Sequence, residues 1–203
     1  SDLSISPPTS AVVSVDIEGA NGKPNIVGVC WEEGQVYVFP WSEELKLWLN
    51  ELFASSCIPV FHNANFDVDE LKQAGVTPPK SYWDTIVMAG MYDPSQPMNL
   101  QWQVLSHVMG STCWKGLIDH EKGPDFTGKN VGIYRQLWTD ILGRLGKSIP
   151  KTGNDWYIFY NGLDTAWGLA LANSFQKKLT NQNRWEYYLK VLQPLQAPLL
   201  KMG

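Results

Sequence analysis

The stretch AVVSVDIEG, residues 11–19, decides the fold and carries the first candidate chemistry of the chain. Its β-branched residues predict a strand over 11–17, and Gly19 lets the backbone turn away directly after two acids. Two similar apolar segments follow, NIVGVCW at 25–31 and QVYVFP at 35–40, with glycines in the connections. We therefore expect the chain to begin as a three-stranded meander.

Helix and strand patterns alternate in the next part of the chain. SEELKLWLNELF at 42–53 has an apolar stripe at helical spacing behind a capping serine, and IPVFH at 58–62 returns to a strand. Further helices are expected over residues 66–75, 82–92 and 99–110. Such alternation predicts an α/β sandwich.

The second half of the chain is less regular. Residues 111–153 contain glycines, lysines and few periodic apolar positions, which predicts an irregular or inserted segment. Residues 155–179 are helix-like again, and 185–201 predict a final helix interrupted by prolines. The expected organisation is a disordered lead-in over 1–10, one domain over 11–182 and a helical segment over 183–203.

The bulk composition is that of a soluble globular protein, since 44% of the 203 residues are apolar and 18% are charged. No apolar run has the length of a membrane span, so we expect a cytoplasmic protein with no membrane partner. The three cysteines form no C-x-x-C pair, which predicts neither a disulfide framework nor a zinc site. A net charge of −4 argues against a protein that coats nucleic acid by charge alone.

Three short motifs carry carboxylates. Asp16 and Glu18 lie two apart at the end of the first strand, so both side chains project from one face of the sheet. The motif HNANFD at 62–67 places Asp67 in the first turn of a helix, where the helix dipole favours a negative charge. Taken alone, each motif is explained by an acidic turn or by helix capping, with Asn63 or Asn65 as the cap.

The third motif is YNGLD at 160–164. It places Tyr160 and Asp164 four residues apart, so the phenol and the carboxylate lie on one face of a helix. A surface hydrogen bond explains this pair as well as function does.

Together the motifs supply four acids that one compact sheet could bring to one place. Convergent carboxylates repel one another unless cations neutralise them. Oxygen ligands favour hard ions such as Mg²⁺ or Mn²⁺, and two ions about 4 Å apart are the usual clamp for displacement at a phosphodiester. The residues alone therefore lead to the hypothesis of a two-metal phosphoryl-transfer site.

The order D-x-E, H-N-x-x-F-D and Y-x-x-x-D resembles the DnaQ-like (DEDD) 3′–5′ exonucleases, in the subclass whose last motif uses Tyr. The closest resemblance is to the proofreading domains of family A DNA polymerases. YWDTIVMAGMYDP at 82–94 is similar to the family's D-T-x-x-x-A segment, and NLQWQVLSHVMG at 99–110 is similar to the helix that follows it. LQPLQAPLLKMG at 192–203 resembles the lead into a polymerase domain.

This resemblance implies an RNase H-like α/β fold, with a five-stranded mixed β-sheet flanked by α-helices. It implies hydrolysis of 3′-terminal nucleotides from single-stranded DNA with two divalent cations, and a polymerase domain in the same parent chain as partner. The residues carried over are Asp16, Glu18, Asp67 and Asp164 as metal ligands, Tyr160 as the residue that orients the attacking water, and Asn63 and Phe66 near the terminal nucleotide. Residues 19–22 depart from the family, which often has a Thr and an apolar wedge in this turn.

Three alternatives stay open. The first is a proofreading domain of a family A polymerase, for which a phage enzyme is one candidate. The second is a free-standing DEDD exonuclease acting on DNA or RNA, and the third is a non-catalytic nucleic-acid-binding module. The lysines of 111–153 are interpreted as part of a solvated loop in preference to a substrate-guiding insert. Trp114 and Trp138 are the candidates for base stacking, whereas His107 and His120 are interpreted as surface or hydrogen-bonded residues.

Overall fold

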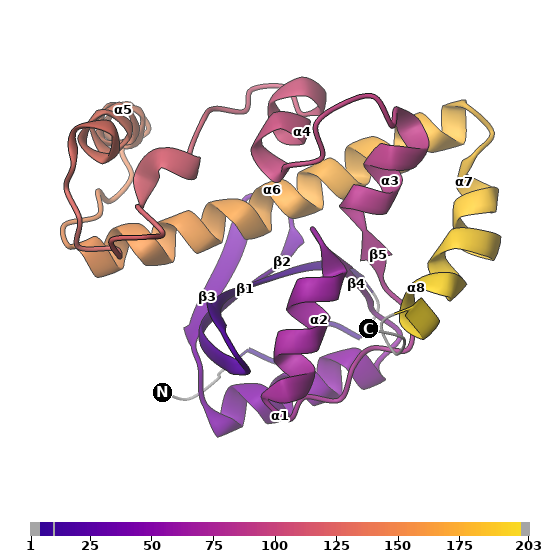
Figure 1. Ribbon diagram of the computed structural model, residues 1–203. Coiled ribbons are helices and arrows are strands. Elements are labelled where there is room, and N and C mark those ends of the chain that lie inside the picture. The colour runs from indigo at the N-terminus through magenta and orange to yellow at the C-terminus, as the bar shows by residue number, and fades with distance from the viewer. Residues whose placement is uncertain (1–4, 10, 200–203) are drawn as a thin grey trace.

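A single five-stranded sheet with the order β3-β2-β1-β4-β5 organises the computed structural model, which describes residues 5–9 and 11–199 (Figure 1). The strands β1 (Val12–Ala20), β2 (Lys23–Glu32) and β3 (Gln35–Pro40) pair antiparallel, which confirms the predicted meander. On the other side of β1, β4 (Ile58–Phe61) and β5 (Trp83–Asp84) pair parallel. The expected five-stranded mixed sheet is therefore confirmed.

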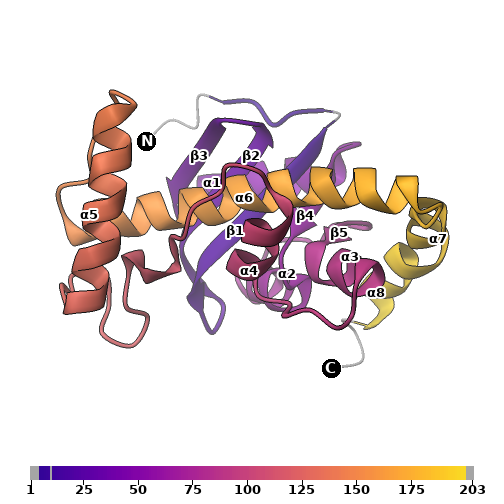
Figure 2. The same cartoon turned by 90° about the horizontal axis from the view of Figure 1, so that it is seen from above.

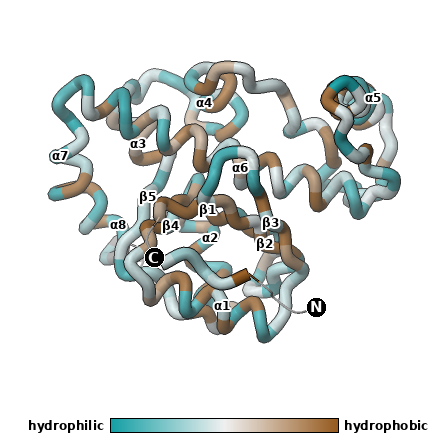
Figure 3. The backbone as a smooth tube through the Cα atoms, turned by 180° about the vertical axis from the view of Figure 1, so that it is seen from behind, coloured by the Kyte–Doolittle hydropathy of each residue, from teal (hydrophilic) through white to brown (hydrophobic). Residues whose placement is uncertain are grey.

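Helices cover both faces of this sheet. The helices α1 (Glu43–Ala54) and α2 (Ala64–Gln73) lie on one face, and the long helix α6 (Gly153–Asn181) crosses the other face (Figures 1 and 2). Beside α6 lie α3 (Thr85–Tyr92) and α4 (Leu100–His107). Hydrophobic residues follow the central strands between these layers (Figure 3).

Strand β1 divides its side chains between the two faces by its alternation. Val13, Val15 and Ile17 enter the core under α1 and α2. The intervening positions face α6, which approaches the sheet closely: a Cβ on Gly168 of α6 would lie 2.6 Å from the Ser14 hydroxyl oxygen. Because Asp16 belongs to this second set, the long helix lies directly against the acids of β1.

The segment 111–153 contains a helix that the sequence analysis missed. After the short 3₁₀ turn η1 (Lys115–Leu117), residues Lys129–Arg144 form α5, at the end of the molecule where α6 begins (Figure 2). The prediction of irregular structure was therefore wrong for 129–144. The helix buries Val131, Trp138 and Leu142, which recur at helical spacing, so the signal for this helix was present in the sequence.

The last described residues pack back on the sheet edge. They form α7 (Trp185–Tyr187), a π-helical turn η2 (Tyr188–Leu192) and α8 (Gln193–Leu199). Tyr188 is fully buried and its hydroxyl oxygen accepts a hydrogen bond from the Asp84 amide at 3.1 Å. This contact holds the C-terminal helices against β5.

Residues 1–10 were expected to form a disordered lead-in, and the structure describes residues 5–9 of this segment. There the carbonyl oxygens of Ile5 and Pro8 accept hydrogen bonds from the Trp48 indole at 2.6 Å and the Cys57 thiol at 2.9 Å. The remaining residues of the lead-in, and 200–203 of the C-terminal segment, lie outside the described residues. Among the helices of 5–9 and 11–199, none combines the length and apolar character that a membrane span requires.

Candidate metal centre

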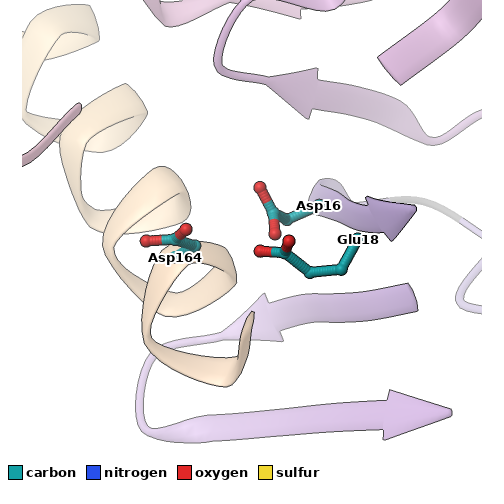
Figure 4. A group of neighbouring side chains, drawn as sticks. All are labelled: Asp16, Glu18 and Asp164. Atoms are coloured by element: carbon teal, nitrogen blue, oxygen red, sulfur yellow. The ribbon is translucent and has the colours of Figure 1, made fainter. Parts of the chain in front are cut away.

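Three of the four predicted acids meet where β1 faces α6. Asp16, Glu18 and Asp164 each offer a carboxylate oxygen, and these oxygens lie within 4.8 Å of one another (Figure 4). The two-residue spacing on β1 sends Asp16 and Glu18 to the same face, and α6 brings Asp164 across from the last third of the chain. All three donors are hard oxygen ligands, which suits Mg²⁺ or Mn²⁺.

The fourth predicted acid, Asp67, lies on α2 and is not one of the three residues whose carboxylate oxygens lie within 4.8 Å of one another. Burial and the neighbouring charges of Asp164, Asp67 and Glu18 raise the pKa of Asp16 well above its usual range. Burial, then the charges of Asp84 and Glu18, also raise the pKa of Asp67. The two residues therefore belong to one electrostatic cluster, in which a bound cation would relieve the repulsion.

Burial and the charge of Asp164 raise the pKa of Glu18 to about 7. This carboxyl group therefore changes charge near neutral pH in the metal-free protein. A divalent cation would favour its charged form, so the electrostatics fit a metal site.

The N-terminus of α2 is capped by a residue outside the predicted motif. Asn63 occupies the cap position in a left-handed conformation (φ 75°), but its side chain makes no capping hydrogen bond. The Asp84 carboxylate instead accepts hydrogen bonds from the amides of Asn63 at 3.2 Å and Ala64 at 2.9 Å. This arrangement leaves the Asn63 side chain free of capping, and Phe66 beside it is 44% exposed.

Tyr160 lies next to the acids on α6, four residues before Asp164, as the spacing predicts. Its side chain is buried, and the hydroxyl oxygen lies 2.8 Å from the Lys115 ammonium and 3.2 Å from Nε2 of His120. Burial and the charge of Asp164 raise the pKa of Tyr160, so the phenol stays protonated. The hydroxyl can therefore act as a hydrogen-bond donor or acceptor without ionising.

Several residues of the centre were missed or misinterpreted from sequence. Lys115 is ion-paired with Asp164, so its assignment to a solvated loop was wrong. Trp114 is fully buried and its indole donates a hydrogen bond to Asp164, which removes it as a base-stacking candidate, and Trp138 is buried too. Asn161, which was not predicted, donates a hydrogen bond to Asp16 and lies inside the YNGLD motif, directly after Tyr160. His120 contacts the Tyr160 hydroxyl, in agreement with its interpretation as a hydrogen-bonded residue.

A cleft of about 810 Å³ opens beside Glu18. Its walls come from the β1–β2 turn, the loop 118–124 and the first turns of α6, including Asn25, His120 and Tyr157. The volume lies within the range of small-molecule sites. The cleft thus gives a ligand direct access to one of the three clustered carboxylates.

The β1–β2 turn at the cleft entrance is fixed against α2. The strand pairing shifts between Glu18 and Gly19, and both carboxylate oxygens of Glu70 accept hydrogen bonds from the turn. The donors are the amides of Asn21 at 3.0 Å and Gly22 at 2.6 Å. This anchoring sets the position of a turn that carries no large apolar side chain.

The sheet order, the flanking helices and the position of the acids on the central strand define an RNase H-like fold, of the kind found in nucleases. No protein-family model and no curated protein sequence matches the chain.

Solved structures share this fold at low sequence identity. Brucella melitensis NrnC bound to pGG has a TM-score of 0.61 and 16% identity, with 96% of this chain and 86% of that chain covered. The same protein with bound Mg²⁺ has a TM-score of 0.60 and 16% identity, with coverage of 96% and 87%. The POL domain of Pol1 from M. smegmatis, in complex with DNA primer-template and dNTP, has a TM-score of 0.63 and 13% identity, with 96% of this chain and 28% of that chain covered.

Proposed function

We propose that the chain is a divalent-metal-dependent 3′–5′ exonuclease. The observation that carries this proposal is the triplet of carboxylates from β1 and α6, whose oxygens lie within 4.8 Å of one another and of which Glu18 lines an open cleft. The nuclease fold supports it, and so does the Mg²⁺ bound by Brucella melitensis NrnC, which shares this fold. Hydrolysis of a phosphodiester is one of the reactions that such a centre supports, and the nuclease fold favours it here.

In this proposal Asp16, Glu18 and Asp164 would hold one ion, and Asp67 would contribute with Asp16 to a second. When bound, such ions polarise the phosphate, activate a water molecule and stabilise the leaving oxygen. The assignment of a second ion rests on the resemblance to the DEDD exonucleases and on the shared electrostatics of Asp16 and Asp67. The indole of buried Trp114 donates a hydrogen bond to the Asp164 carboxylate and so orients it.

Tyr160 is assigned the orientation of the attacking water. Its hydroxyl stays protonated and lies beside Asp164, so it can hold a water on one line of approach without taking its proton. Loss of this hydroxyl removes orientation but leaves the metal ligands in place. We therefore expect a smaller effect at Tyr160 than at Asp16.

The substrate in this proposal is the 3′ end of a single strand. The cleft beside Glu18 has room for a nucleotide, and the partly exposed ring of Phe66, with the side chain of Asn63, is offered for contacts with the terminal base. The family A proofreading context stays a proposal that rests on the three motifs and the Pol1 likeness. It places a polymerase domain in the same parent chain.

A free-standing nuclease is the second candidate. This chain matches 86% of the NrnC chain and 28% of the Pol1 chain, so its fold is shared with both kinds of protein. The dinucleotide pGG in the NrnC structure suggests short oligonucleotides as substrates in this case. The two candidates share one chemistry and differ in substrate length.

The test is a degradation assay with 5′-labelled single-stranded DNA, RNA and the dinucleotide pGG, in Mg²⁺ or Mn²⁺. We expect a ladder that shortens from the 3′ end, near-complete loss in Asp16→Asn and partial loss in Tyr160→Phe. Asp140→Asn is the matched control, because Asp140 is an exposed acid on α5. A ladder that persists in Asp16→Asn would refute the metal assignment, and a lack of cleavage with every substrate and ion would favour a binding module.

A further inference from the structure

Lys115 contacts both of the α6 residues that the proposed chemistry uses. Its ammonium nitrogen lies 2.5 Å from Oδ2 of Asp164 and 2.8 Å from the Tyr160 hydroxyl oxygen. Within the described part of the chain, it is the one Lys or Arg side chain that is ion-paired with the carboxylate triplet. A positive charge is thus already present where the acids converge.

The two oxygens of Asp164 have different partners. Oδ1 accepts the hydrogen bond of the Trp114 indole, which is fully buried, whereas Oδ2 accepts the ammonium of Lys115. The Lys115 side chain is 34% exposed, so it can leave the carboxylate without opening the core. One oxygen is therefore held by a buried donor and the other by a partly exposed partner that can be exchanged.

The backbone that carries Lys115 is fixed independently of its side chain. The amides of Trp114 and Lys115 both donate hydrogen bonds to Oε1 of Gln101, each at 2.9 Å. A change at the end of the lysine side chain therefore leaves the start of η1 in place. The charge of Lys115 also lowers the pKa values of Asp16 and Glu18, against the larger effect of burial.

We propose that Lys115 is the resident counter-ion of the triplet. In the metal-free protein its ammonium occupies the Oδ2 side of Asp164, where a divalent cation would bind, and metal binding displaces it. The inference rests on the proposed metal site, and it adds a competition between a side chain and the ion. The ammonium offsets the repulsion among the acids in the metal-free protein. The same ammonium opposes the ion, because two cations cannot share the Oδ2 side of Asp164 without strong repulsion.

Removal of this charge has two opposite consequences. The metal-free protein loses the cation that balances its buried acids, so its melting temperature falls. The metal site loses its competitor, so Mn²⁺ binds more tightly, by about tenfold or more for a charge at contact distance. A lysine that served merely to hold Asp164 in position would give the reverse, since its loss would weaken metal binding.

The experiment measures Mn²⁺ binding by calorimetry, together with the melting temperature with and without Mn²⁺. Lys115→Met removes the charge and keeps the chain length, Lys115→Arg keeps a charge, and Lys80→Met removes an exposed lysine away from the acids as the control for net charge. We expect Lys115→Met to melt lower without metal and to bind Mn²⁺ at least about tenfold more tightly. Lys115→Arg and Lys80→Met are expected to stay within about threefold of wild type.

Equal or weaker Mn²⁺ binding in Lys115→Met, with a circular dichroism spectrum like that of wild type, would overturn the inference. Should Lys115→Met fail to fold, Lys115→Gln provides the same comparison with a shorter neutral side chain. Failure of the proposed function has a different signature. In that case wild type would bind no Mn²⁺, or Asp16→Asn would bind it as well as wild type does. The two failures are therefore distinguishable.

Discussion

The side-chain amide of Asn161 donates a hydrogen bond to Oδ2 of Asp16 at 2.7 Å and lies 3.3 Å from the carbonyl oxygen of the same residue. It joins the centre of β1 to α6 between Tyr160 and Asp164. Asn161 is fully buried, and its Oδ1 has no hydrogen-bond partner within the described part of the chain. One amide thus fixes the orientation of an acid from a distant segment.

Asn161→Ala is expected to weaken Mn²⁺ binding, because Asp16 loses the donor that sets its rotamer. A lost hydrogen bond to a carboxylate corresponds to about 1.5–3 kcal/mol, or roughly tenfold to a hundredfold in the dissociation constant. Calorimetric titration with Mn²⁺ measures the change. Asn173→Ala is the matched control, since Asn173 lies on the same helix and donates to Glu33 at the surface. Equal affinities in the two variants would contradict the assigned role.

Gly28→Ala is expected to separate β2 from α6. Gly28 lies opposite Asp16 in the sheet, and an added Cβ would overlap the Thr165 hydroxyl and approach Oδ1 of Asn161 to 2.6 Å. Overpacking of this kind destabilises a protein by about 1–3 kcal/mol and here also displaces Asn161 from Asp16. Chemical denaturation gives the loss of stability, and the Mn²⁺ titration gives the loss of affinity. Gly132→Ala on α5, where a Cβ meets nothing within 4 Å, is expected to be neutral or stabilising.

The metal-free protein is expected to lose stability as the pH rises from 4.5 to about 7. Burial and Asp164 raise the folded-state pKa of Glu18 from 4.5 to about 7, so the folded state binds its proton more tightly than the unfolded chain does. The stabilising contribution is complete below pH 4.5 and is lost as the pH passes through 7. Melting curves in EDTA from pH 4.5 to 8 measure it. In Glu18→Gln the fall across this window should be smaller, and parallel curves for the two proteins would contradict the assignment.

Asp84→Ala is expected to destabilise the protein more than the loss of an ordinary helix cap. Besides the amides of Asn63 and Ala64, the Asp84 carboxylate accepts a hydrogen bond from the Ile86 amide at 2.8 Å, so it caps α2 and α3 at once. Donors left without a partner in a buried site cost about 2–4 kcal/mol together. Ser42→Ala, which removes the single cap of α1, should cost about 1 kcal/mol. Similar urea midpoints for the two variants would be inconsistent with the double cap.

The sequence by itself determined the first three strands and the positions of the acids on them and on the helices. The β-branched runs of β1, β2 and β3 set the meander, and the two-residue spacing of Asp16 and Glu18 placed both acids on one face, because side chains alternate along a strand. The i, i+4 spacing likewise placed Tyr160 beside Asp164. The helix α5 was missed although Val131, Trp138 and Leu142 recur at helical spacing, because the glycines and lysines of 111–153 were interpreted as loop residues.

Only the tertiary structure decided which side chains surround these acids. Lys115 and Asp164 are 49 residues apart, and Asn161 and Asp16 are 145 apart, so no local spacing relates the members of either pair. Their contacts depend on the close approach of α6 to the sheet at Gly28 and Gly168 and on the anchoring of η1 by Gln101. Periodicity encodes the direction of a side chain along its own element, whereas its partner across the core is set by packing between elements distant in sequence.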